Sequence, residues 1–284
     1  MISAATTGEA VASHYDELDP YYRSLWGQHV HHGLWETGRE SAQEAVIALS
    51  HTVARRAGIT EGMRVCDVGC GYGGTAHLLA ASYGAQVTGI TVSPKQYEAA
   101  IGQGEAANPD FILRDWMENG LPSASFDAVI AIESTEHLPD VARGIDEMAR
   151  VLRPGGRLVI CAWMAGPDPE PWEVRHLLEP ICREGCLVGM GNKEDYERWI
   201  ADAGLAMESE EDISRKVRRT WPICIRRTLA GFFTDPSLRR YLLSDFSRNR
   251  VFALTLMRIW IAYVTGAMRY VVFTATKPPL TGPS

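Results

Sequence analysis

The first chemistry-bearing pattern in the sequence is a glycine-rich loop that follows a short apolar run. Gly69, Gly71 and Gly74 form a GxGxxG motif within the segment DVGCGYGG. A loop of this kind between a strand and a helix lets the backbone approach a nucleotide closely. Folds that bind dinucleotides and folds that bind a methyl donor both use it, so the motif alone predicts an adenosine-containing ligand and no more.

Two features distinguish between these ligands. A dinucleotide site usually places an acid about 20 residues beyond the loop, on the ribose hydroxyls, but no acidic residue occurs here between Gly69 and Glu98. Asp67 directly precedes the glycines, where a carboxylate is unfavourable beside a pyrophosphate but suits an ammonium group. The pattern therefore favours S-adenosylmethionine (SAM), which carries an ammonium, a sulfonium and no phosphate. An NAD-dependent oxidoreductase is the disfavoured alternative.

Side chains after the next two predicted strands could complete such a site. Thr91 ends the second strand, and Gln96, one turn into the following helix, could reach the ribose hydroxyls. Asp115 follows the third strand and could accept a hydrogen bond from the adenine amino group. Trp116 offers an apolar or stacking face, although core packing would also explain a tryptophan at this position.

A second cluster, in the segment ESTEHLPD, contains groups suited to proton transfer. His137 lies just past the fourth predicted strand, and a histidine with a pKa near neutrality is a natural base for a phenol, an amine or an activated ring carbon. Glu136 could orient its imidazole or hold a cationic acceptor, and Glu133 could contact donor or acceptor. The alternative is that His137 only completes a helix terminus.

Three further histidines, His29, His31 and His32, raise the question of a metal site. Their H-x-H-H spacing has no nearby carboxylate, and the sequence contains neither HExxH nor a zinc-type cysteine pair. We therefore expect no metal, and we expect these residues to pack in a lid and contact the acceptor.

The elements that must position these residues alternate between strands and helices. Strands are predicted over residues 63–68, 86–91, 110–115, 126–134 and 157–163, with 206–214 and 269–277 as the sixth and seventh. Helices are predicted over 41–56, 75–83, from Pro94 onward, and over 141–152, 173–186 and 193–203, with 1–60 and 214–268 largely helical. The pattern indicates an α/β fold with a doubly wound, mostly parallel sheet, whose strand ends share one edge.

Composition excludes several other classes of protein. The 284 residues are 46% hydrophobic and 22% charged, with a formal net charge of −7, which is ordinary for a soluble globular chain and argues against a nucleic-acid binder. No secretory signal is visible, and 252–264 is too short to span a bilayer. We expect a cytoplasmic protein with at most peripheral membrane contact through the basic run 215–227, which a solvated helix face would also explain. A homo-oligomer is left open.

Several segments resemble a known family. DVGCGYGG, VTGITVSPKQ and RPGGRL resemble class I SAM-dependent methyltransferases. WGQHVHHGLW (26–35) and ESTEHLPD (133–140) resemble the γ-tocopherol methyltransferase-like group, which is related to sterol C-methyltransferases and plant alkaloid N-methyltransferases. Matches at 193–205 and 263–278 extend the resemblance over nearly the whole chain.

The resemblance implies a seven-stranded Rossmann-like methyltransferase fold and a set of SAM contacts. Those contacts would come from Asp67, Gly69, Cys70, Gly71, Thr91, Val92, Gln96, Asp115 and Trp116, with Tyr15 in an N-terminal lid. It further implies a helical lid at 1–60, a SAM-binding core at 61–165, and at 166–284 the rest of the core with a helical acceptor-binding insertion. Gln28, where plant members typically have Glu, and the basic run are departures that argue against tocopherol as the acceptor.

The predicted function is methyl transfer from SAM to a hydrophobic small molecule. C-methylation of an aromatic or prenylated specialised metabolite is the first choice, and His137, Glu136 and Glu133 are the candidate catalytic residues. N- or O-methylation, a methylation-triggered cyclase and a SAM-binding module without catalysis are the alternatives.

Overall fold

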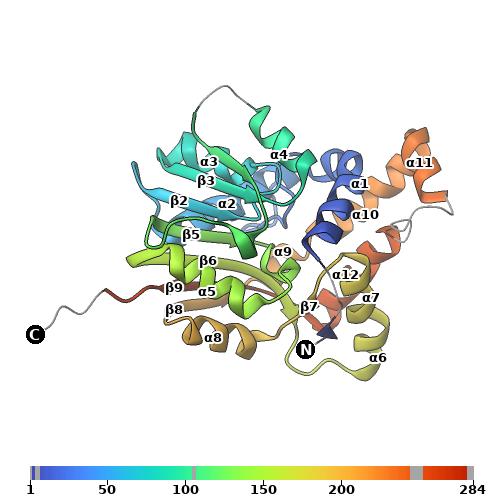
Figure 1. Cartoon of the computed structure of the whole chain (residues 1–284). Coiled ribbons are helices and arrows are strands. Elements are labelled where there is room, and N and C mark those ends of the chain that lie inside the picture. Colours follow the sequence, from blue (N-terminus) through green and yellow to red (C-terminus); the bar gives the residue numbers. More distant parts are fainter. Residues whose placement is uncertain (1, 4–6, 104–106, 244–251, 280–284) are drawn as a thin grey trace, which may run out of the picture.

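The centre of the molecule is a seven-stranded sheet with strand order β4-β3-β2-β5-β6-β9-β8 (Figure 1). The computed structural model describes residues 2–3, 7–103, 107–243 and 252–279. β9 runs antiparallel to β6 and β8, and the other neighbours pair in parallel. The strands are β2 (Arg64–Val68), β3 (Gln86–Thr91), β4 (Asp110–Leu113), β5 (Phe126–Ile132), β6 (Leu152–Ala165), β8 (Ala206–Asp212) and β9 (Met268–Thr276).

Helices cover both faces of the sheet. The helices that alternate with the strands are α2 (Ala42–Ala57), α3 (Gly74–Tyr83), α4 (Pro94–Ile101), α5 (Val141–Val151) and α8 (Lys193–Asp202). Two short 3-10 turns, η1 (Trp116–Glu118) and η2 (Thr135–His137), follow β4 and β5. Neighbouring residues of a strand belong to different core layers. Ile130 faces the layer that contains α2 and α3, whereas Val129 faces the layer that contains α5 and α8.

The remaining helices gather at one end of the sheet, on the right in Figure 1. They are α1 (Gly8–Trp26), α6 (Pro171–Glu173), the π-helical η3 (Val174–Leu178), α7 (Glu179–Glu184), α9 (Ser214–Val217), α10 (Thr220–Thr234), α11 (Pro236–Leu243) and α12 (Phe252–Thr265). The turns η1 and η2 directly follow β4 and β5, so they mark the carboxyl ends of these strands. The additional helices lie at the same end and cover the edge where open α/β sheets bind ligands. Within the described ranges, no helix is both long enough and apolar enough to cross a bilayer.

The structure confirms the predicted α/β class and the seven predicted strands, and it corrects some of their bounds. The predicted fifth strand begins at Leu152 rather than at residue 157, because the Pro154–Gly156 turn is drawn into the sheet. A bulge between Phe126 and Ala128 absorbs the extra residues, and Gly155 and Gly156 form backbone hydrogen bonds with Lys277 beyond β9. Asp115 leaves the strand because its carboxylate caps η1.

Most of the predicted helical regions are confirmed, but the prediction of helix was wrong for 27–41, which form a connection without helix. Residues 171–184 form one helical stretch whose middle turn is π-helical. A small antiparallel pair, β1 (Ile2–Ser3) with β7 (Gly189–Met190), was not predicted. Part of the predicted helical stretch 214–268, residues 244–251, lies outside the described residues. Ser93 and Pro94 begin α4 as N-cap and first helical residue, as predicted.

Candidate active site

Most of the residues predicted to bind the donor line a single cavity at the carboxyl edge of the sheet. They are Tyr15, Gly69, Gly71, Thr91, Val92, Gln96, Asp115 and Trp116. Several other lining residues were not predicted individually, among them Gly8 and Val11 of α1 and Val30 of the 27–41 connection, although all three lie in the predicted lid. They belong to α1 and the 27–41 connection, which together cover the cavity and are called the covering segment below. Their place in the lining depends on how this segment folds over the sheet.

Two glycines of the loop are required by close approaches of other segments. Gly69 has φ of 74°, and a Cβ on it would lie 2.4 Å from the Cβ of Ser134. Ser134 is fixed there because its Oγ donates a 2.5 Å hydrogen bond to the carbonyl of Val68. Gly74 has a different neighbour, since a Cβ on it would lie 2.7 Å from the carbonyl oxygen of Gln28 in the covering segment. A side chain at either position would displace backbone.

Asp67 is a buried carboxyl group at the end of β2. Burial raises its pKa to about 7. Its side chain has no hydrogen bond or ion pair with any residue in the described part of the chain. A buried acid without a partner is unfavourable, so its place directly before the cavity-lining Val68 and Gly69 suits a cationic group of a ligand.

Cys70 differs from its neighbours in the loop. Its thiol points to the Gly71 carbonyl at 3.8 Å and packs against Gly89, and burial raises the thiol pKa. It is not among the cavity-lining residues. The Cys70 side chain therefore packs inside the protein against β3 and does not face the cavity.

Thr91 and Gln96 act as a pair at the opposite side of the loop. The Thr91 hydroxyl donates a 2.7 Å hydrogen bond to Oε1 of Gln96, and both residues line the cavity. Gln96 is held in the first turn of α4 because its backbone N–H donates to the Ser93 hydroxyl. The arrangement presents an amide toward the place where ribose hydroxyls are expected.

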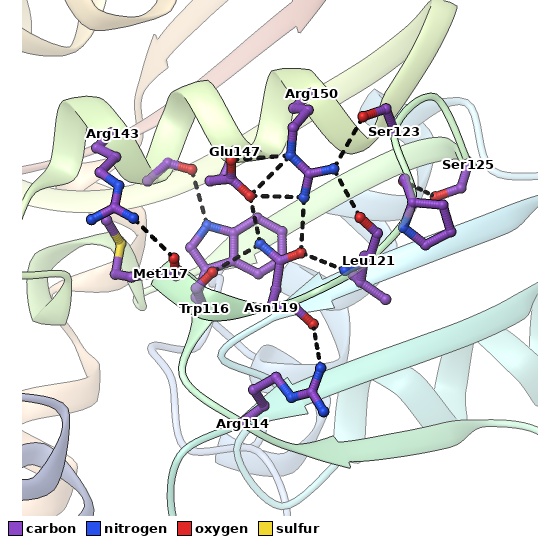
Figure 2. Close-up of polar contacts among 12 residues, drawn as sticks. Arg114, Trp116, Met117, Asn119, Leu121, Ser123, Ser125, Arg143, Glu147 and Arg150 are labelled. Carbon is purple, nitrogen blue, oxygen red and sulfur yellow. Dashed lines mark hydrogen bonds and ion pairs between the residues drawn. The ribbon is translucent and has the colours of Figure 1, made fainter.

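Trp116 forms both a wall of the cavity and part of the core. Its indole N–H donates to the Gly144 carbonyl at 2.9 Å. Figure 2 shows the polar contacts around Trp116 and Asn119. The buried Asn119 amide donates to the Trp116 carbonyl and to Glu147, and Arg150 donates to both Asn119 and Glu147. This network fixes the peptide that carries the indole, so the tryptophan is a rigid face for a ligand.

A second cavity lies beside the first one. The two share Tyr15, Val30, Glu133 and His137. The second is lined further by His14, Tyr22, His31, His32, Trp163, Ile181, Glu184, Gly185, Leu187, Thr220, Trp221, Thr255, Leu256 and Ile259. No lysine or arginine occurs among these described lining residues, and the side chain of Glu184 is engaged by Thr255 and Arg258.

His137 and Tyr15 are hydrogen-bonded at the boundary between the two cavities. Nε2 of His137 is 2.9 Å from the Tyr15 hydroxyl, and Nδ1 is 3.1 Å from the Cys186 carbonyl. A carbonyl can only accept, so Nδ1 carries the proton and Nε2 presents its lone pair to the Tyr15 O–H. Burial lowers the pKa of His137 and raises that of Tyr15. The imidazole is thereby kept neutral and able to take a proton.

Glu133 anchors the covering segment rather than facing a ligand freely. Its Oε1 accepts from the His32 backbone N–H at 2.7 Å and from the Tyr270 hydroxyl at 2.8 Å, and its Oε2 lies 2.9 Å from His32 Nδ1. Trp221 donates to the other ring nitrogen of His32 at 2.8 Å. Because an indole only donates, Nε2 of His32 is the acceptor of this bond, and Nδ1 faces the carboxylate of Glu133.

The charge of this cluster resides on Glu133. Burial pushes the pKa of Glu133 upward, but its interactions with His32 outweigh burial and hold the pKa below its ordinary value. Its backbone has φ of 54°, a left-handed conformation that costs about 1–3 kcal/mol for a non-glycine residue. The surrounding hydrogen bonds must maintain that conformation.

Glu136 does not contact His137 through its side chain and lines neither cavity. Its Oε1 accepts from the Trp163 backbone N–H at 2.6 Å, and the Thr135 hydroxyl donates to Oε2 at 3.2 Å. Burial raises its pKa to about 8. The His137 ring is therefore oriented by the Cys186 carbonyl and Tyr15, and not by Glu136 as we had predicted.

The histidines of the covering segment turn toward different partners. His31 bonds to the His32 carbonyl and lies 3.4 Å from the Ser50 hydroxyl, whereas His29 packs beside Gly74 and His31. Burial lowers the pKa of both, that of His29 to about 3. Among the described residues, no group of three His, Cys, Asp or Glu side chains could hold a metal ion.

Comparison with known proteins gives consistent matches. Residues 66–160 match the family model described as "Methyltransferase domain". A chloroplastic tocopherol O-methyltransferase from Arabidopsis thaliana is 31% identical, over 98% of this chain and 86% of the relative. A 27-O-demethylrifamycin SV methyltransferase from Amycolatopsis mediterranei is 33% identical, over 96% of this chain and 98% of the relative.

Solved structures agree on the fold. The crystal structure of the cyclase SpnF is similar with a TM-score of 0.80 and 28% identity, covering 98% of this chain and all of that one. The mycolic acid cyclopropane synthase CmaA1, complexed with S-adenosylhomocysteine, has a TM-score of 0.83 over 96% of this chain and 99% of its own. Its 18% identity is evidence for the fold alone.

Replacing Glu133 tests its role as an anchor. We expect Glu133→Gln to lower the free energy of unfolding by about 1–3 kcal/mol, because an amide N–H₂ must then face one of the three donors. Urea denaturation measures the change. The exposed Glu118→Gln serves as the matched control, with an expected change within about 0.5 kcal/mol. Equal stability of the two variants would contradict the anchoring role.

The network behind Trp116 gives a second test. Asn119→Ala removes both amide donors and the acceptor used by Arg150, so we expect a loss of about 2 kcal/mol in unfolding free energy. We also expect the affinity for the methyl donor SAM to fall severalfold, because the Trp116 indole is no longer fixed. Ser123→Ala, at the exposed rim of the same network, is the control. Unchanged donor affinity in Asn119→Ala would show that the network does not position Trp116.

Proposed function

The chain belongs to the class I SAM-dependent methyltransferases of the tocopherol and sterol type, and from that membership we propose that it methylates an uncharged, lipophilic acceptor that carries a hydroxyl group. The observation that carries the proposal is the Tyr15–His137 hydrogen bond, which lies on the boundary shared by the two cavities. The first cavity would hold the donor and the second the acceptor, so a base lies where they meet.

The residues of the first cavity, together with Asp67 beside it at the end of β2, fit the donor group by group. The unpartnered carboxyl of Asp67 would hold the ammonium, Thr91 and Gln96 the ribose hydroxyls, and Asp115 and Trp116 the adenine. When bound, SAM supplies an electrophilic methyl group on a sulfonium. The protein's part is to align that group with the acceptor and to exclude water.

The lining of the second cavity supports an acceptor without charge. Its side chains are largely aromatic and aliphatic, and in the part of the chain that the structure describes no cationic side chain lines it to bind a phosphate or carboxylate. Glu133, His137 and Trp163 contribute to this lining from the sheet region, and its other residues come from α1, the 27–41 connection and the part of the chain between 181 and 259. We therefore propose that 1–60 acts as a lid, that 61–165 binds SAM, and that the helical part of 166–284 binds the acceptor.

Proton removal can follow the existing hydrogen bond. The acceptor hydroxyl gives its proton to the Tyr15 oxygen as the Tyr15 proton passes to His137 Nε2, leaving an imidazolium and a neutral phenol. The raised pKa of Tyr15 disfavours a free tyrosinate, so the two transfers are coupled. The Cys186 carbonyl stabilises the imidazolium through Nδ1.

An acceptor phenol that has lost its proton is nucleophilic at its oxygen and at neighbouring ring carbons. C-methylation of an aromatic or prenylated metabolite is our first choice, O-methylation the second, and N-methylation a third. A cyclase that stabilises a carbocation is less well supported, because the carboxyl groups of Glu133 and Glu136 are both engaged by hydrogen bonds inside the protein. NMR of the product formed from methyl-labelled SAM distinguishes these outcomes.

Removing the base tests the catalytic part of the proposal. We expect His137→Ala to lower kcat by about 10²-fold or more while the Kd for SAM changes less than about threefold. Tyr15→Phe should lower kcat in the same direction, because the relay loses its oxygen. The exposed His176→Ala is the control and should retain turnover. Wild-type turnover in His137→Ala would remove this residue from the mechanism.

Asp67 predicts how SAM affinity depends on pH. The free protein protonates Asp67 below about pH 7, whereas a bound ammonium favours the ionised form. Affinity should therefore fall by up to about tenfold per unit as pH drops from 7 to 5.5. Isothermal titration measures it, and Asp67→Asn should bind weakly with little pH dependence. A flat profile in the wild type would contradict the assignment.

A further inference from the structure

The helices around the acceptor cavity carry large apolar side chains on their outer faces. Leu229 and Phe233 of α10 lie four residues apart, opposite its buried Trp221 and Cys224. On α12, the buried side includes Leu256, Ile259 and Ala262. The opposite side of α12 exposes Leu254, Met257, Trp260 and Val264, by 37% to 56%. Apolar patches of this extent on neighbouring helices indicate an interaction surface.

The same region is strongly basic. Between Ser214 and Leu243 the sequence contains eight basic residues and one acidic residue, a formal charge of +7 in a chain whose net charge is −7. Arg218, Arg226, Arg239 and Arg240 are exposed, and none of them has an ion-pair partner among the residues that the structure describes. Positive charge is therefore concentrated around the apolar stripes, although the molecule as a whole is acidic.

We propose that the outward side chains of α10, α11 and α12 form a face that docks on anionic lipid surfaces. This outer helical face comprises Arg226, Leu229, Phe233, Arg239, Arg240, Leu254, Met257, Trp260 and Val264. Apolar side chains enter the boundary between head groups and acyl chains, and arginines contact the acidic head groups. In this arrangement the helices lie along the lipid surface with their apolar stripes toward it.

Charge distinguishes a lipid surface from a second copy of the chain. A symmetric dimer through this face would bring two clusters of unpaired arginines together, and like charges at a contact are unfavourable. An anionic lipid surface satisfies the arginines and the apolar stripes at once. α10 packs against both α11 and α12, so their outward groups belong to one region of the molecule.

The position of the acceptor cavity indicates a function for the outer helical face, and this step rests on the proposed function. Thr220 and Trp221 of α10 and Leu256 and Ile259 of α12 line that cavity. The helices that would rest on the lipid are thus the ones that enclose the acceptor. A lipophilic acceptor dissolved in the bilayer would be taken up at the docking site without crossing water.

Vesicle sedimentation tests the proposal with the full chain. The vesicles are phosphatidylcholine alone or phosphatidylcholine with phosphatidylglycerol, each at 50 and 300 mM salt. Phe233→Ser and Arg226→Glu probe the outer helical face. The matched controls are Trp172→Ser, a half-exposed tryptophan on α6, and Arg55→Glu on α2, both outside the face.

We expect the wild type to bind the anionic vesicles at least tenfold more strongly than the neutral ones, and less strongly at high salt. Phe233→Ser and Arg226→Glu should each weaken binding about fivefold or more, and the controls should bind as the wild type does. Absence of wild-type binding at low salt, or equal binding by all variants, would overturn the proposal. So would a wild-type dimer that Phe233→Ser dissociates, since a second copy would then occupy the face.

Titration of the same proteins with SAM separates this inference from the proposed function. All variants should bind SAM as the wild type does, because none of the four residues lines either cavity. Normal SAM binding with failed sedimentation would overturn the docking face alone. Lipid binding without SAM binding would instead contradict the proposed function.

Discussion

The contact between Glu133 and His32 holds the two parts of the active site together. One buried carboxylate at the end of β5 accepts hydrogen bonds from the backbone and ring of His32, 101 positions earlier in the chain, and from Tyr270 on β9. Its strength comes from burial, because a carboxylate removed from water requires several donors. The covering segment, the central strand and the antiparallel strand are thereby fixed around one charge, and the boundary between donor and acceptor cavities is fixed with them.

Local sequence patterns were sufficient to predict most of the residues that line the first cavity, to which we assign the donor. The glycine loop, Thr91 with Gln96, and Asp115 with Trp116 each follow a strand directly, and parallel strands bring their carboxyl ends to one edge. The acceptor half could not be predicted in this way. The hydrogen bond between Tyr15 and His137 joins residues 122 positions apart, and neither has a local pattern that identifies the other. The role of Glu133 likewise depends on a partner that only the folded lid supplies.

The fold was predictable for the same reason, and the errors in the predicted strand bounds have physical causes. Alternating strands and helices are encoded in short apolar runs, so all seven strands were identifiable. The predicted fifth strand left out the Arg-Pro-Gly-Gly segment, but Lys277 beyond β9 forms backbone hydrogen bonds with this segment that no local pattern reveals.

Gly74 shows that one signature can record two different constraints. The first two glycines of the GxGxxG motif line the first cavity, but Gly74 does not, and its missing side chain makes room for the Gln28 carbonyl instead. An alanine at position 74 would therefore press on the connection that covers the loop and leave the cavity wall unchanged. The third glycine of the motif thus belongs to the fit between the loop and its cover.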